Sequence, residues 1–139
     1  MQQIRDVMTP DPITLAATAT LVEGSRAMRD NAIGDVLVLA DQRLCGVVTD
    51  RDIVTRALAD SLDPTTTVLG DICTAEVVTV RPDDTVDDAT QLMRTRAIRR
   101  LPVVDETGMP IGVVTLGDLA VEYDAKSALA DISAAPPTS

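Results

Sequence analysis

The chain has 139 residues, a formal net charge of −10 and 45 % apolar residues, which suits one compact domain or two small halves that share a core. The acidic balance and the near-absence of aromatic residues (Tyr123 alone) argue against a protein that binds nucleic acid. The absence of histidine, with Cys45 and Cys73 in separate segments, predicts no metal site, no catalytic residue and no enzyme.

The N-terminus and the lack of a long apolar stretch give the expected location of the protein. MQQIRDVMTPDP is charged and contains proline, unlike a signal peptide, and no stretch approaches the roughly 20 apolar residues of a membrane span. We therefore expect a cytoplasmic protein with no membrane contact.

Cys45 and Cys73 are interpreted as small buried hydrophobes, with a disulfide or redox pair as the alternative.

The first half of the chain alternates between strand and helix patterns. Thr20 is followed three residues later by Glu23, which is typical of a helix start, and Leu21 and Met28 recur at helical spacing. Pro64 and the threonines after it stop the second helix. The expected elements are an extended piece, a helix, two strands and a helix: 12–15, 20–30, 36–39, 44–48 and from Asp50 onward.

The second half repeats the first, as Asp6/Asp71, Thr14/Thr79 and Met28/Met93 show. Its expected elements are 77–80, 85–96, 101–104, 111–114 and a helix from Leu116. The fold class is therefore α+β, with two β-α-β-β-α repeats that pack about a pseudo-twofold axis. The predicted boundaries are a first repeat, a linker, a second repeat and a tail with a possible helical stretch: 1–60, 61–68, 69–124 and 125–139.

The clearest repeated motif is GVVTDRDI at 46–53, which returns as GVVTLGDL at 112–119. One interpretation is structural: threonine at the strand end caps the following helix, and aspartate three residues later favours the positive end of the helix dipole. The other is chemical: threonine meets a phosphate, aspartate accepts hydrogen bonds from a ribose, and glycine lets a ligand ring approach the backbone. Both interpretations remain open from the residues alone.

The duplicated unit, the strand Leu101-Pro-Val-Val-Asp105 and the repeated G-h-h-T-x-x-D-h run resemble a tandem pair of CBS domains, often called a Bateman module. The resemblance covers roughly residues 4–123. It implies a regulatory sensor that binds AMP, ADP, ATP or a related adenosyl ligand in clefts between the repeats, requires no cofactor, and forms a homodimer. It also implies that Asp takes the ribose hydroxyls and Thr approaches the phosphate, at Thr49 with Asp52 and at Thr115 with Asp118.

The resemblance extends to residues beside the motif. It implies phosphate contacts from Arg99 and Arg100, for which a solvated strand entrance is the alternative. It also implies an adenine slot lined by apolar residues of the opposite repeat, which are ordinary core residues in the alternative interpretation: Ile13 and Ile33 for the second-repeat site, Val78 and Ile98 for the first.

The two copies differ in ways that predict unequal sites. Gly34-Asp35 stands where the second copy has Arg99-Arg100, and an acid there repels phosphate, although Arg51 compensates in part. The first copy also has Leu37 where the family usually has the proline seen at Pro102. We expect the Asp118 site to bind nucleotide more readily than the Asp52 site.

The expected output is a change in dimer shape or in the binding of an unidentified protein partner. The alternative is an interaction or stress-associated protein without a ligand, in which both motifs are helix caps. Docking would then use the acidic surface and the second helix around 52–56.

Overall fold

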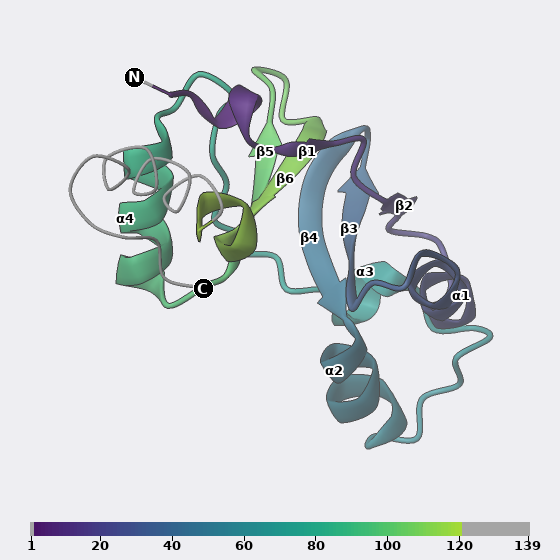
Figure 1. Cartoon of the computed structure of the whole chain (residues 1–139). Coiled ribbons are helices and arrows are strands. Elements are labelled where there is room, and N and C mark those ends of the chain that lie inside the picture. The colour runs from purple at the N-terminus through teal and green to yellow at the C-terminus, as the bar shows by residue number, and fades with distance from the viewer. Residues whose placement is uncertain (1, 121–139) are drawn as a thin grey trace. The chain divides into compact units, whose positions relative to one another are not determined.

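The computed structural model describes residues 2–120, and the C-terminal tail predicted at 125–139 lies outside them. The chain divides into two compact units, each built from separate stretches of sequence (Figure 1). Among the described residues, unit 1 combines 2–10 with 79–105 and 111–120, and unit 2 combines 11–78 with 106–110. The sequence predicts that each repeat is one continuous stretch, 1–60 and 69–124, whereas each unit of the structure combines separate stretches. The two divisions describe different things, so the predicted boundaries stay a prediction.

Unit 2 contains most of the first repeat around a three-stranded sheet of order β2-β3-β4. β2 runs parallel to β3, and β3 runs antiparallel to β4 through the tight turn at 41–42. Its elements are β2 (Thr14–Ala16), α1 (Leu21–Asn31), β3 (Asp35–Ala40), β4 (Arg43–Thr49), α2 (Asp50–Asp52), the π-helix η2 (Ile53–Leu58) and α3 (Leu69–Ile72).

Unit 1 contains most of the second repeat and a sheet of order β1-β6-β5, which Figure 1 shows beside α4. β1 is antiparallel to β6, with Thr9 opposite Val113. The elements are the 3-10 helix η1 (Ile4–Asp6), β1 (Thr9–Pro10), α4 (Val86–Arg96), β5 (Arg100–Val104) and β6 (Pro110–Thr115), followed by helical residues 116–120.

The two long helices begin where the sequence predicts. The Thr20 hydroxyl accepts a hydrogen bond from the Glu23 amide at 3.2 Å, and Thr85 does the same for Asp88 at 3.1 Å. Each bond satisfies an amide that has no partner within the first helical turn. α4 ends at Arg96 as expected, and α1 ends at Asn31, one residue beyond the predicted Asp30.

Each unit has its own aliphatic core. In unit 2 the core lies between the sheet and α1, where Leu21, Val36, Val38 and Val48 are at most 1 % exposed. In unit 1 the fully buried side chains include those of Ile4, Leu101, Val103 and Val114. Branched aliphatic residues therefore fill both cores, as the composition predicts.

The first residues of each repeat join the sheet of the other repeat, within one unit. Residues 9–10 form β1 on the edge of β6, and Thr74 forms a bridge with Val47 on β4. Residues 77–80, expected to be extended, contribute a single parallel bridge between Val80 and Val103. Local sequence patterns do not encode which sheet edge a short segment will reach, so this exchange was not predicted.

In the described part of the chain, every helix is too short or too polar to cross a membrane.

Candidate functional site

The second copy of the repeated motif forms a reciprocal cap in unit 1. The Thr115 amide donates to Asp118 Oδ2 at 2.9 Å, and the Asp118 amide donates to Thr115 Oγ1 at 3.1 Å. Both residues are half-buried. The cap uses Oδ2 of the carboxylate and a lone pair of the hydroxyl, so Oδ1 and the hydroxyl proton are not part of it.

Two arginines lie next to this cap. The Leu116 amide, at the first helical residue after the strand, donates to the Arg99 carbonyl at 2.8 Å. Arg100 follows as the first residue of β5, and both arginine side chains are exposed. Unit 1 therefore brings together four of the residues nominated from the sequence: Thr115, Asp118, Arg99 and Arg100.

The first copy forms the same cap in unit 2. The Thr49 amide donates to Asp52 Oδ2 at 3.0 Å, and the Asp52 amide donates to Thr49 Oγ1 at 3.0 Å. Here Arg56 also approaches Asp52 Oδ1, with 3.6 Å between the atoms. The sequence analysis did not nominate Arg56, although its position four residues after an acid on a helix is the usual signal for such a pair.

Negative charge gathers around the cap in unit 2. Asp35 lies directly opposite Thr49 in the sheet, and the Asp50 amide donates to the Gly34 carbonyl at 2.9 Å. The corresponding positions in unit 1 hold Arg100 and Leu116. Arg51 is exposed, and its amide donates to the Asp50 carboxylate at 2.8 Å. The electrostatic difference expected between the two copies is therefore present around the caps.

The apolar residues nominated for the adenine slot are half-buried parts of the two units. Ile13 and Ile33 pack against the core of unit 2. Val78 is the last residue of the stretch 11–78 of the same unit, and Ile98 lies in unit 1. Just after α1, the Ile33 amide donates to the Met28 carbonyl, and just after α4, the Ile98 amide donates to the Met93 carbonyl. Their role in a ligand site stays a prediction.

The motif glycines have a structural task that the sequence interpretation missed. A methyl group at Gly46 would lie 2.7 Å from Cys73 Sγ and 2.8 Å from the Thr74 carbonyl oxygen. A methyl group at Gly112 would lie 2.6 Å from Met8 Sδ and 2.9 Å from the Thr9 carbonyl oxygen. The space left by the missing side chains is thus taken by residues 8–9 and 73–74, and the interpretation that the glycines let a ligand ring approach the backbone stays a prediction.

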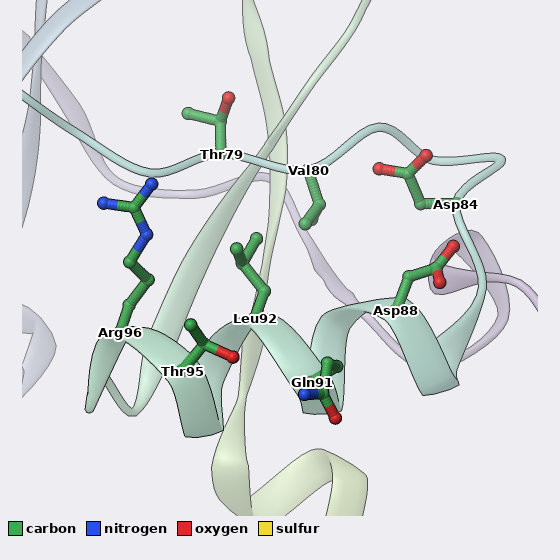
Figure 2. Close-up of a pocket in the computed structure, with 8 residues that line it drawn as sticks. All are labelled: Thr79, Val80, Asp84, Asp88, Gln91, Leu92, Thr95 and Arg96. Atoms are coloured by element: carbon green, nitrogen blue, oxygen red, sulfur yellow. The ribbon is translucent and has the colours of Figure 1, made fainter.

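Unit 1 also contains an open groove of about 450 Å³ between the segment at 79–84 and α4. Figure 2 shows Val80 and Leu92 facing each other in its middle, with Arg96 toward one end and Asp84 and Asp88 toward the other. Among the described residues that line the groove, none was nominated from the sequence. The groove is therefore a feature separate from the cap at Thr115.

Metal binding finds no support in the described residues, because they contain no cluster of three or more side chains suited to holding a metal ion. The carboxylates of the two caps bond to backbone amides, as a helix start requires. This arrangement can hold and orient a small polar molecule, and it offers no nucleophile with an adjacent base.

Comparison with known proteins identifies the family. The model of the CBS domain matches residues 4–59 and 69–124. The CBS domain-containing protein YhcV of Bacillus subtilis is 37 % identical over 137 residues, with 96 % of each chain covered. Hypoxic response protein 1 of Mycobacterium tuberculosis is 32 % identical over 121 residues, covering 86 % of this chain and 84 % of that protein.

Solved structures show the same fold. A crystal structure of Hypoxic Response Protein I with two coordinated zinc ions is 32 % identical, has a TM-score of 0.79, and covers 88 % of this chain and 99 % of that one. The CBS domain pair of protein MJ0100, in complex with 5′-methylthioadenosine and S-adenosyl-L-methionine, is 25 % identical with a TM-score of 0.77, over 91 % and 98 % of the two chains. The chain thus belongs to the CBS domain family, and its two repeats form a tandem CBS pair.

Proposed function

We propose that this CBS pair is a regulatory module that binds an adenosine nucleotide of the AMP, ADP or ATP class at the cap formed by Thr115 and Asp118. The structure of the MJ0100 domain pair, which holds two adenosyl ligands, supports the adenosine part of this proposal. The observation that carries it is the geometry of Asp118. Its Oδ2 is used by the cap, which leaves Oδ1 to accept from a ribose hydroxyl.

The phosphate end of the ligand is assigned to three residues. The Thr115 hydroxyl can donate its proton to a phosphate oxygen while its lone pair stays in the cap. Arg99 and Arg100 supply positive charge from exposed side chains beside the same helix start. Guanidinium groups bind phosphate through strong, charge-assisted hydrogen bonds, so these arginines favour a nucleotide over an uncharged nucleoside.

The cap at Thr49 and Asp52 is proposed as the weaker site. Arg56 Nε lies 3.6 Å from Asp52 Oδ1, the carboxylate oxygen that takes no part in the cap. Arg56 therefore competes with a ribose hydroxyl for that oxygen. Asp35 and Asp50 add negative charge near the position where a phosphate would lie. Repulsion between like charges lowers affinity for an anionic ligand there.

Calorimetric titration of the purified chain with AMP, ADP, ATP, NAD and S-adenosylmethionine tests this function. The informative variant is Asp118→Asn, since the amide oxygen can keep the hydrogen bond from Thr115 while the carboxylate charge and the second acceptor are lost. Asp52→Asn is the matched control. Saturable binding by the wild type that is lost in Asp118→Asn and kept in Asp52→Asn supports the proposal, and heat-free titrations with all five ligands contradict it.

A second candidate function is an interaction protein without a ligand, and two observations favour it. The capping bonds alone account for the Thr and Asp of both motifs. The helix η2 also exposes Val54 and Leu58, which are 56 % and 57 % exposed and four residues apart. An exposed apolar pair on one helix face is typical of a protein contact.

A further inference from the structure

Cys45 lies at an irregularity in the sheet of unit 2. Along the β3–β4 ladder Val38 pairs with Gly46 while Leu39 pairs with Leu44, so Cys45 is the extra residue of a bulge. A bulge changes the direction of a side chain relative to simple alternation along the strand. As a result Cys45 packs against the same core as Cys73, the residue that follows α3.

The backbone holds the two cysteine segments together. The amides of Val47 and Thr74 each donate to the carbonyl of the other, at 3.1 Å and 3.0 Å. Cys73 Sγ lies over Gly46, 2.7 Å from the position that a methyl group on that glycine would occupy. One thiol therefore lies over the residue next to the other cysteine, and both side chains are partly exposed to solvent.

The second copy of the fold shows that the core does not require two thiols at these positions. Met8 lies over Gly112 as Cys73 lies over Gly46, with Sδ 2.6 Å from the corresponding methyl position. Ile111 takes the place of Cys45. Aliphatic and thioether side chains thus fill the same space in unit 1, and the paired thiols in unit 2 offer chemistry that packing does not need.

From this juxtaposition we propose that Cys45 and Cys73 are a reversible oxidation site, at which a peroxide-class oxidant joins them in an intramolecular disulfide between β4 and the residue after α3. One sulfur attacks hydrogen peroxide, the O–O bond breaks, and a sulfenic acid and water form. The second sulfur then attacks the sulfenic sulfur and releases a second water. Two thiols and one peroxide thereby give one disulfide and two waters, and the sulfurs lose two electrons.

The surroundings of the pair set its reactivity. Burial, and next the Cys73 thiol beside it, raise the pKa of the Cys45 thiol. Cys45 therefore keeps its proton at neutral pH, and the reaction accelerates as pH rises, because the thiolate is the nucleophile. The Cys73 thiol donates weakly to the Gly70 carbonyl at 3.7 Å, a bond that it must give up to reach Cys45.

Peptide mapping of the full chain after peroxide treatment tests the proposal. Trypsin cleaves after Arg43, Arg51 and Arg56 but not after Arg81, which precedes Pro82, so the next cleavage follows Arg94. Cys45 therefore lies in peptide 44–51 and Cys73 in peptide 57–94. Without reductant we expect these two peptides as one cross-linked species, an intact mass lower by two hydrogen atoms, and a fall from two free thiols per chain to none. Dithiothreitol restores both thiols.

The double variant Cys45→Ile/Cys73→Met is the matched control, because it copies the residues that fill the same space in unit 1. It has no thiol, so under the same peroxide dose it can neither lose two hydrogen atoms nor form the cross-linked species, and oxidation of its methionines would only add oxygen. Three results overturn the proposal: two free thiols after prolonged peroxide, disulfides that join separate chains, or sulfinic acid at either cysteine without the cross-linked peptide. Cys73→Met alone leaves one thiol and distinguishes an internal disulfide from modification of Cys45 by itself.

Discussion

Asp118 and Thr115 hold each other through two hydrogen bonds from a backbone amide to a side chain, with the Thr115 amide 2.9 Å from Asp118 Oδ2 and the Asp118 amide 3.1 Å from Thr115 Oγ1. The same pair of residues therefore starts a helix and presents a carboxylate oxygen and a hydroxyl proton outside the cap. A structural role and a ligand-binding role are compatible in this geometry, so affinity and stability must be measured on the same variants.

Asp118→Ala removes the carboxylate from both roles. The loss of the cap and of a charge near the helix start lowers the free energy of unfolding by about 0.5–1 kcal/mol, as urea denaturation monitored by circular dichroism would show. If nucleotide binding is also lost from a chain that is still folded, the carboxylate is a ligand contact. A variant that loses this much stability and binds as well as the wild type leaves the aspartate as a cap alone.

The motif glycines give a prediction about packing. Gly46→Ala places a methyl group 2.8 Å from the Thr74 carbonyl oxygen, and Gly112→Ala places one 2.9 Å from the Thr9 carbonyl oxygen. Backbone cannot yield as a flexible side chain does, so each variant should lose about 1–3 kcal/mol of stability in urea denaturation.

Gly117→Ala is the control for both glycine variants, because the nearest atom to its added methyl group is Thr115 Oγ1 at 3.6 Å. It lies in the helical residues 116–120, where alanine is favoured over glycine, so its stability should be unchanged or raised by up to about 1 kcal/mol. Equal losses in all three variants would contradict the account of the exchanged segments.

Much of the fold could be predicted from local patterns. Thr20 and Thr85 predicted the starts of their helices, because a capping hydroxyl and an acid three residues later act within one helical turn. The strands β3, β4, β5 and β6 followed from runs of aliphatic residues separated by turns. These features depend on residues close together in the sequence, and the similarity between the two halves of the chain predicted their arrangement as repeats.

The remaining features depend on contacts between distant residues. Met8 lies over Gly112, and Cys73 over Gly46, because the first residues of each repeat pack in the unit that holds most of the other repeat, which no local pattern records. The bulge at Cys45 shifts the register of β4 against β3, which the apolar run at 44–48 does not reveal. For the candidate site, the repeated motif identified the capping residues. The hydrogen bond from the Leu116 amide to the Arg99 carbonyl joins residues far apart in the sequence, so only the folded structure shows it.

Val54 and Leu58 predict self-association through η2. Among the described residues they are the most exposed large apolar side chains. We expect the wild type to be a dimer and Val54→Glu/Leu58→Glu to shift it toward monomer, because two charges would be buried against the partner. Light scattering after size-exclusion chromatography measures this shift, and Gln42→Glu in the exposed β3–β4 turn controls for added charge. A monomeric wild type would refute the prediction.

The raised pKa of Cys45 predicts a pH dependence of stability under reducing conditions. The ordinary thiol value is 9.0, so the unfolded chain releases this proton at a lower pH than the folded chain. The contribution is fully present below the unfolded pKa and is lost as pH rises through the folded pKa. Wild type should lose more stability than Cys45→Ile between neutral and alkaline pH, measured by urea denaturation with dithiothreitol. Parallel pH profiles for the two proteins would argue against a raised pKa at Cys45.

Oxidation of the proposed pair should stabilise the chain. A disulfide from residue 45 to residue 73 restricts the unfolded state, and loops of this length give about 3–4 kcal/mol in the chain-entropy model. The midpoint of urea denaturation should therefore rise after peroxide treatment and fall again with dithiothreitol, while Cys45→Ile/Cys73→Met shows the same midpoint under both conditions. A cross-linked chain with a lowered midpoint would mean that the disulfide distorts β4, whose last residue is Thr49 of the first cap. In that case nucleotide affinity at Asp118, measured before and after oxidation, would show whether the strain stays within unit 2.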